Sequence, residues 1–197
     1  MIVHKDIEQK SEEWFLIKWG RVGGTASKGL FVDSDTLFID ILSQRIEEFE
    51  PSEGFENEAM QRGNELEPFA IEYLNQYTGR KFESFGWLQS EENEILGISP
   101  DGMTADHKVM AETKCLARKK HTEIILANEI PMEHRCQALH YFTVNPKLEK
   151  LYWCAFRPES VKNFIEELTR DSILDIGLKK KIEIPQTENT TPLNSRL

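Results

Sequence analysis

Long apolar runs and paired cysteines are both missing from this sequence, and each absence excludes a class of protein. No apolar run approaches the ~20 residues that a membrane-spanning helix needs. The first residues, MIVHKDIEQKSEEW, lack the apolar core of a signal peptide. The sequence therefore predicts a cytoplasmic protein without a membrane association.

Cysteine is scarce and widely spaced. Cys115, Cys136 and Cys154 form neither a CxxC motif nor an even disulfide framework. Their apolar neighbours predict buried thiols in a reducing compartment. An iron–sulfur cluster, which takes four cysteines, is not expected here.

Positive charge is also in short supply. Asp and Glu number 34 against 24 Lys and Arg, which gives a formal net charge of −10. Proteins that bind nucleic acid usually present basic surface, because neutralising phosphates dominates their affinity. Acidic residues concentrate in 47–67 and 83–94, whereas 108–121 is locally basic. A metal site would need carboxylates of its own, and bound cations would offset their charge. We expect weak binding to isolated duplex at physiological salt.

The size and composition fit one globular domain. The chain has 197 residues, of which 39% are hydrophobic and 29% charged. We expect a single domain over 1–182. Residues 183–197 are polar and rich in Pro, Thr and Asn, which predicts a flexible tail.

The chemistry of the chain concentrates in the stretch ILGISPDGMTADHKVMAETKCL, residues 95–116. Asp101 follows Pro100 at the end of a short apolar strand. In a second strand, period-2 alternation places Glu112 and Lys114 on one face. If the two strands pair as a hairpin, two carboxylates and an ammonium converge.

Such a set has a chemical use. Two hard oxygen ligands suit Mg²⁺ or Mn²⁺, and a lysine beside the metal can orient or deprotonate water. Each part alone has a structural explanation. Ser-Pro-Asp-Gly is a good turn sequence, and Glu-x-Lys is an ordinary exposed strand face.

Taken in order, these residues resemble a known signature. Pro100-Asp101 followed by Glu112-Thr113-Lys114 resembles the PD-(D/E)xK nuclease motif. Upstream lies QRGNELEP, residues 61–68, and downstream lies QALHY, residues 137–141. The whole series, over roughly 12–158, resembles the lambda-exonuclease and YqaJ family of phage-type recombination nucleases. The last element also resembles the Q-xxx-Y element of RecB-type nuclease domains.

The resemblance implies roles for residues at the site. The metal ligands would be Asp101, Glu112, the Thr113 carbonyl and Glu67, with Glu65 a weaker candidate than Glu67. Lys114 would position or activate the attacking water, and Gln137 would align the phosphodiester or the water. The metal would be Mg²⁺, with Mn²⁺ able to substitute.

The resemblance also implies a pocket for a terminal 5′-phosphate. In the family a basic residue on the first helix and a hydroxyl after a glycine-containing turn hold this group. Counting from Trp14 gives Lys18 and Thr25, while Arg21 or Ser27 remain alternatives.

Further contacts with DNA are expected at four positions. Arg118 and Lys119 begin a basic run that also includes Lys120, although such a run is usually a solvated face. Arg62 would either pair with nearby acids or touch the DNA backbone. Tyr141 shares a helix face with Gln137, since the two are four residues apart.

The predicted fold is an α/β restriction-endonuclease-like core, a mixed central sheet flanked by helices, with N-terminal helical additions. We expect helices at 11–20, 36–49, 57–77, 118–128, 131–143 and 159–181, and strands at 81–89, 95–99, 109–115 and 148–156. The first three strands would form a meander. Residues 36–49 would pack in the core or between subunits, and Phe69, Tyr73, Leu74 and Tyr77 would point inward.

These patterns predict a metal-dependent DNA exonuclease. The resemblance further implies 5′ to 3′ digestion of linear duplex, a ring-shaped trimer, and a partner that anneals single strands. Three alternatives remain: an endonuclease of the same fold, a nuclease-fold binding module, and an acidic scaffold or small-molecule metal hydrolase. The net charge of −10 is the sole support for the last.

Overall fold

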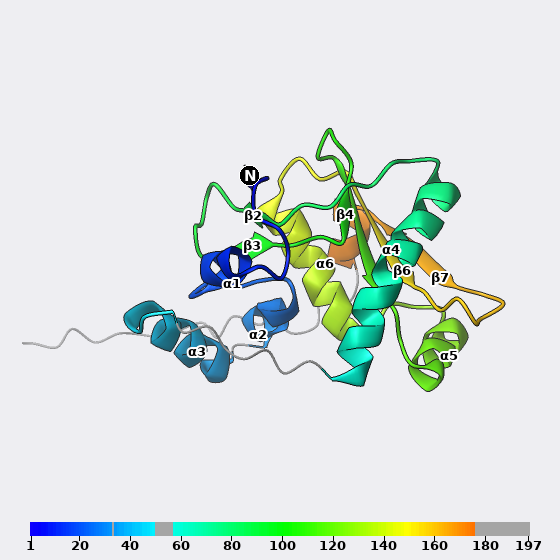
Figure 1. Ribbon diagram of the computed structural model, residues 1–197, viewed down its shortest axis with the longest axis horizontal. Helices are drawn as coiled ribbons and strands as arrows, with labels where there is room; N and C mark the ends of the chain where they lie inside the picture. The colour runs from blue at the N-terminus through cyan, green and yellow to red at the C-terminus, as the bar shows by residue number, and fades with distance from the viewer. Residues whose placement is uncertain (33, 50–56, 176–197) are drawn as a thin grey trace, which may run out of the picture.

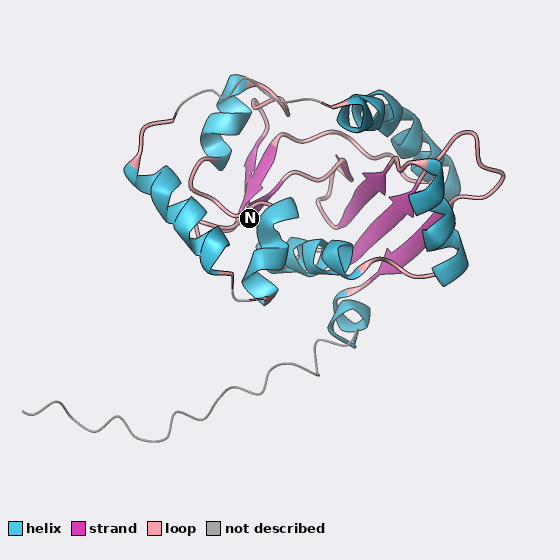
Figure 2. Cartoon of the chain, turned by 90° about the horizontal axis from the view of Figure 1, so that it is seen from below, coloured by secondary structure: helices cyan, strands magenta, loops and turns pink. Residues whose placement is uncertain are grey.

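Two small sheets and the helices around them make up the described part of the chain (Figures 1 and 2). The computed structural model describes residues 1–32, 34–49 and 57–175. One sheet has the order β1-β2-β3, with strands Ile2–His4, Trp87–Gln89 and Gly97–Ile98. The other has the order β4-β5-β6-β7, with strands Gly102–Met103, Val109–Lys114, Lys150–Ala155 and Phe164–Leu168.

The helices come from every part of the chain. They are α1 (Glu12–Lys18), the 3-10 turn η1 (Thr25–Ser27), α2 (Lys28–Phe31), α3 (Asp35–Ile46), α4 (Glu58–Thr78), α5 (Arg118–Ala127), α6 (Met132–Val144) and α7 (Arg170–Asp175). None of them combines the length and apolarity that crossing a bilayer requires. The N-terminal helices lie beside the smaller sheet, apart from the larger one (Figure 2).

The larger sheet is mixed and covered on both faces, as the predicted fold requires. Strands β5 and β6 are parallel, and the other two pairings are antiparallel. A parallel pair needs a long crossover, which α5 and α6 supply. Helix α4 buries Ala70 and Leu74 against one face of the sheet, and α6 buries Ala138 and Phe142 against the other.

Local signals set the helix ends. Ser11 caps α1, since its hydroxyl accepts a hydrogen bond from the Trp14 amide. Asn57 caps α4 in the same way. Gly79 ends α4 in the left-handed conformation that glycine adopts at low cost.

The predicted meander is wrong, because its strands divide between two sheets. Strand β2 pairs with β1 and β3, whereas β5 pairs with β4 and β6. The chain crosses from one sheet to the other at Pro100 and Asp101, which lie between β3 and β4. The predicted strand 81–89 is regular only at β2, although Glu83 bridges to Met103.

The helix predicted at 159–181 is also wrong. Residues Phe164–Leu168 form β7, which pairs antiparallel with β6. Phe164 and Leu168 are four residues apart, and both are buried. That spacing puts two side chains on one face of a strand as well as of a helix, so periodicity alone misassigned this segment. Residues 176–197, including the predicted tail, lie outside the described residues.

Two predicted apolar faces are more exposed than expected. Phe69 and Tyr77 of α4 point to solvent, while Leu74 is buried as predicted. Helix α3 has no buried residue, so its assignment to the core is wrong. Its packing between subunits remains a prediction.

The packing of α4 predicts where truncation is costly. Leu74→Ala should lower the free energy of unfolding by about 2–5 kcal/mol, because the side chain is fully buried and leaves a cavity. The matched control is Leu126→Ala on α5, which is exposed and should change stability little. Urea denaturation measures both, and equal losses would contradict this account of the core.

Candidate active site

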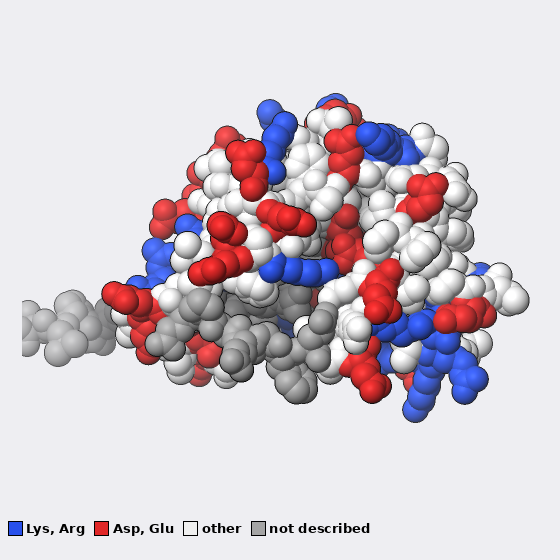
Figure 3. All heavy atoms as spheres, viewed as in Figure 1, with Lys and Arg blue, Asp and Glu red and all other residues white. Residues whose placement is uncertain are grey.

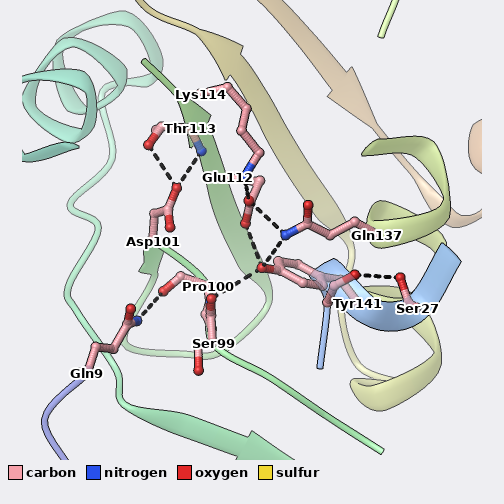
Figure 4. Close-up of polar contacts among 11 residues, drawn as sticks. Gln9, Ser27, Ser99, Pro100, Asp101, Glu112, Thr113, Lys114, Gln137 and Tyr141 are labelled. Atoms are coloured by element: carbon pink, nitrogen blue, oxygen red, sulfur yellow. Dashed lines mark hydrogen bonds and ion pairs between the residues drawn. The ribbon is translucent and has the colours of Figure 1, made fainter. Parts of the chain in front are cut away.

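The candidate site begins where the two sheets meet. The Oδ2 atom of Asp101 accepts hydrogen bonds from the Thr113 amide at 2.6 Å and the Thr113 hydroxyl at 2.8 Å (Figure 4). Gly102 pairs with Ala111 across β4 and β5, which brings Asp101 beside the end of β5. The sheet pairing therefore positions the carboxylate predicted from sequence.

Glu112 lies on β5, one residue before Thr113, and its side chain faces helix α6. The side chain is 3% exposed, and its carboxylate accepts three hydrogen bonds. Gln137 Nε2 donates to Oε1 at 2.7 Å, and the Tyr141 hydroxyl donates to Oε2 at 2.5 Å. Lys114 Nζ also donates to Oε1. Because Gln137 and Tyr141 lie one helical turn apart, α6 presents both donors to the same carboxylate (Figure 4).

The charges at this point are strongly coupled. Burial, and then the nearby Glu112 carboxylate, raise the pKa of Asp101 from 3.8 to about 8. Burial alone would lower the pKa of Lys114, but Glu112 and Asp101 outweigh it, so the net pKa of Lys114 is raised. The pocket therefore disfavours the ionised form of Asp101, which a bound cation would stabilise.

Glu67 lies near this group without joining it directly. Its charge contributes to raising the pKa of both Asp101 and Lys114, which places it in their electrostatic surroundings. Its Oε2 atom is 3.8 Å from the Nζ of Lys10, a cation that the sequence analysis missed.

The donor set fits a hard divalent cation. Within the described residues, no three His, Cys, Asp or Glu side chains come together as a ready-made metal cluster. Mg²⁺ is commonly held by one or two carboxylates, with water and substrate phosphate completing its shell. The raised pKa of Asp101 beside Glu112 is the observation in favour of such an ion.

A pocket of about 420 Å³ opens over these residues. Two groups of residues line it. We call Asp101, Glu112, Lys114 and Gln137 the floor, and Lys18, Gly23, Gly24 and Thr25 the wall. The N-terminal segment closes one side, where Gln9 Nε2 donates to the Pro100 carbonyl at 3.0 Å. The structure thus brings the predicted carboxylate site and part of the predicted phosphate pocket into one cavity.

The four candidates for the end phosphate differ in accessibility. Lys18 lies with Nζ 3.3 Å from the centroid of the Trp14 ring, and burial lowers its pKa to about 8. Thr25 is exposed and lines the pocket. Arg21 also lines it, but its guanidinium donates to the carbonyls of Ile17 and Glu94.

Ser27 is less accessible than Thr25. The residue is 0% exposed, and its hydroxyl donates to the Gly24 carbonyl at 2.5 Å. This burial favours Thr25 over Ser27 as the contact for the phosphate. The Ser27 hydroxyl closes the turn that presents Thr25.

Tyr141 is 1% exposed, and its hydroxyl donates to Glu112, although the residue also lines the pocket. Its contact with DNA stays a prediction. Arg62 pairs with Glu159 at 2.9 Å, which was one of the two expectations for it. Arg118 and Lys119 are exposed at the start of α5 and do not line the pocket.

The surface around the site is not uniformly acidic. Figure 3 shows basic side chains gathered at the lower right, where Figure 1 places α5. Arg118, Lys119 and Lys120 are the exposed basic residues of its first turn. This patch is the strongest local departure from the net negative charge on that face.

Two supporting contacts had no signal in the sequence. The Trp14 ring nitrogen donates to Ser99 Oγ at 2.8 Å, and the Tyr141 hydroxyl oxygen, whose hydrogen is donated to Glu112, lies 3.3 Å from the Ser99 carbonyl. These contacts join α1 and α6 to the segment that ends in Asp101. The partners lie 85 and 42 residues apart, and no local spacing predicts such pairs.

The raised pKa of Asp101 predicts the pH dependence of stability in the metal-free protein. Because the folded pKa is near 8 and the ordinary value is 3.8, stability from this group is present below about pH 4 and is lost as pH rises through 8. The free energy of unfolding of Asp101→Asn, relative to that of the wild type, should increase as pH rises from 5 to 8, by at most about 1.4 kcal/mol per pH unit.

Urea denaturation in the presence of a chelator measures this difference. The control is Asp106→Asn, because hydrogen bonds from Thr104 and Lys108 lower the pKa of that exposed carboxyl. Its difference from wild type should not grow in the same direction. Parallel curves for Asp101→Asn and the wild type would contradict the assigned charge coupling.

The chain is similar to known proteins in sequence and in fold. A family described as the YqaJ-like viral recombinase domain matches residues 13–147. No curated protein sequence matches the chain significantly.

Solved structures show the same fold. An alkaline exonuclease from Laribacter hongkongensis superposes with a TM-score of 0.72 at 23% identity, over 86% of this chain and 87% of that one. Its complex with dAMP superposes with a TM-score of 0.70 at 23% identity, over 83% of this chain and 85% of that one. A phage-related exonuclease from Haemophilus somnus superposes with a TM-score of 0.50 at 14% identity, over 79% of this chain and 87% of that one.

These matches confirm the predicted fold class, a restriction-endonuclease-like mixed sheet flanked by helices. The family match spans more than half of the chain and ends three residues after α6, the helix that carries Gln137 and Tyr141. The chain belongs to the family of YqaJ-like viral recombinase domains.

Proposed function

We propose that this protein is a metal-dependent DNA exonuclease that hydrolyses phosphodiester bonds in linear duplex. The observation that carries the proposal is the shared pocket, which is lined by Asp101, Glu112 and Lys114 together with Lys18 and Thr25. A purely structural cluster has no use for two coupled carboxylates in an open pocket, since their burial is costly. The recombinase family and the exonuclease fold support the same activity.

In this proposal Asp101 and Glu112 hold Mg²⁺, or Mn²⁺ in its place, with the Thr113 carbonyl and Glu67 as further candidates. When bound, the metal would polarise the phosphate and stabilise negative charge as the bond breaks. Gln137 and Tyr141 fix the orientation of Glu112 by donating to its two oxygens. The role of Gln137 is thus to hold the carboxylate as well as to line the substrate pocket.

Lys114 is the candidate for handling the attacking water. Its ammonium lines the pocket and donates to Glu112, so it can position a water for in-line attack on phosphorus. The 3′-oxygen would leave on the opposite side. This arrangement needs no covalent enzyme intermediate.

Lys18 and Thr25 are the proposed contacts for a terminal 5′-phosphate, which would give digestion from 5′ to 3′. The related alkaline exonuclease has been crystallised with dAMP, and a nucleotide of that size is the product expected of such a reaction. The basic first turn of α5 would contact the DNA backbone through Arg118 and Lys119.

The wider setting rests on the family. We propose that the chain acts as a homotrimer on duplex with free ends, together with a protein that anneals the exposed strands. A single domain over 1–182 is proposed for the whole activity. These statements extend the recombinase assignment.

The proposal predicts the behaviour of Lys114→Ala. Loss of the ammonium should lower the cleavage rate by at least about 100-fold, with the fold intact. The matched control is Lys108→Ala on the same hairpin, because Lys108 is exposed and pairs with Glu149 away from the pocket. A folded Lys114→Ala protein that cleaves at near the wild-type rate would exclude the assigned role.

Three end-labelled substrates test the activity itself: 5′-phosphorylated linear duplex, 5′-hydroxyl linear duplex and closed circular DNA. With Mg²⁺, we expect progressive loss of the phosphorylated duplex, slower loss of the hydroxyl duplex, and no cutting of the circle. Cutting of the circle would instead indicate an endonuclease. No cutting of any substrate would indicate a binding module.

A further inference from the structure

His140 is a buried histidine on α6 that the proposed chemistry does not use. It is 2% exposed, and its Nε2 atom lies 3.2 Å from the Val22 carbonyl and 3.0 Å from the Gly97 carbonyl. Both partners are acceptors, so Nε2 must carry the hydrogen. Burial lowers the pKa of the ring, which keeps it neutral at pH 7.

The two carbonyls belong to segments that lead to different residues lining the pocket. Val22 directly precedes the turn that contains Gly23, Gly24 and Thr25, the wall of the proposed phosphate pocket. Gly97 begins β3, which leads within four residues to Asp101. The segments touch each other where the Gly97 amide donates to the Val22 carbonyl at 3.1 Å.

Helix α6 adds a third connection. Gln137 and Tyr141, which bond to Glu112, lie three residues before and one residue after His140. One imidazole therefore joins the phosphate-pocket turn, the strand leading to Asp101 and the helix that holds Glu112.

The turn and the helix are in close contact at Gly24. A Cβ atom built on Gly24 would lie 2.9 Å from the Tyr141 ring and 3.1 Å from Gln137 Nε2. Real Cβ atoms rarely come so near, so the absence of a side chain at Gly24 allows the turn to pack this closely against α6. The hydrogen bond from His140 opposes movement of the turn away from α6, because it holds Val22 against the same helix.

We propose that His140 is a positioning residue whose Nε2–H fixes the phosphate-pocket turn relative to the Asp101 and Glu112 carboxylates. It does not contact substrate. It determines whether a DNA end seated against Lys18 and Thr25 places its phosphodiester over the carboxylates. The inference rests on the proposed exonuclease function.

Misplacing a reacting group by about 1 Å can reduce the rate roughly 100-fold. Loss of the donor should therefore reduce kcat, beyond any effect on folding. It should also loosen Lys18 and Thr25 relative to the floor of the pocket. Discrimination between 5′-phosphorylated and 5′-hydroxyl ends should then weaken.

The chain provides a matched control. His121 on α5 is also 2% exposed, and its Nε2 lies 3.0 Å from a single carbonyl, that of Lys162. It lies outside the pocket. Replacing it removes an equally buried histidine with a similar hydrogen bond, so it reports the purely structural cost of such a loss.

The test compares His140→Leu, His140→Asn and His140→Gln with His121→Leu. Gln places an amide N–H near the position of Nε2 and should restore both bonds. Asn is one bond shorter than Gln and should not restore these bonds. It also provides a polar variant if His140→Leu fails to fold. Circular dichroism verifies folding before each assay.

Two readouts are taken for each variant. The first is kcat and KM on phosphorylated linear duplex with Mg²⁺. The second is binding of 5′-phosphorylated and 5′-hydroxyl duplex in a chelator, measured by fluorescence anisotropy. The second readout is independent of cleavage and of the metal.

We expect His140→Leu and His140→Asn to lose at least about tenfold in kcat and to bind the two ends more equally than the wild type. His140→Gln should remain near wild type on both readouts, and His121→Leu should keep the wild-type discrimination. Folded His140 variants that match His121→Leu on both readouts would overturn the proposal.

Failure of the proposed end pocket has a different signature. If the wild type itself does not distinguish the two ends, the assignment of Lys18 and Thr25 fails. The positioning role is then tested by kcat alone. A loss of kcat in His140→Leu and His140→Asn that is absent in His140→Gln supports the role. An unchanged kcat in all His140 variants contradicts it.

Discussion

Burial of two like charges side by side is the constraint on which this structure depends. Asp101 and Glu112 meet where charge is poorly solvated, and their repulsion contributes to raising the pKa of Asp101 to about 8. Such a pair is tolerated because each carboxylate accepts several hydrogen bonds. Thr113 donates twice to Asp101, while Gln137 and Lys114 are among the donors to Glu112. A divalent cation would replace the proton on Asp101 and so stabilise both carboxylates, which makes the pocket suited to such an ion.

The architecture follows from the need to supply those donors. The chain leaves one sheet and enters the next at Pro100 and Asp101, so the first carboxylate sits at the junction. Strand β5 carries the second carboxylate, Glu112, and the lysine, Lys114. Helix α6 packs on the sheet and binds Glu112 through Gln137. The N-terminal helix α1 then closes the pocket, with Lys18 over the ring of Trp14. Segments far apart in sequence thus form one cavity.

Sequence reasoning located the carboxylates because their signal is local: alternation on β5 placed Glu112 and Lys114 on one face, and a Pro-Asp turn marked Asp101. The division into two sheets could not be predicted, since β1 to β4 contain only two or three residues each. Strand β7 was mistaken for a helix because its buried residues are four apart. The hydrogen bond from Tyr141 to Glu112 could not be predicted either, because its partners lie 29 residues apart.

Binding of Mn²⁺ to the DNA-free protein, followed by electron paramagnetic resonance at pH 6 and pH 8, tests the central claim most directly. The account predicts binding by the wild type that is tighter at pH 8, because the ion competes with the proton on Asp101. Asp101→Asn and Glu112→Gln should lose it, while Asp106→Asn should not. Equal binding by all four proteins, or none by the wild type at either pH, would contradict a metal site at this carboxylate pair.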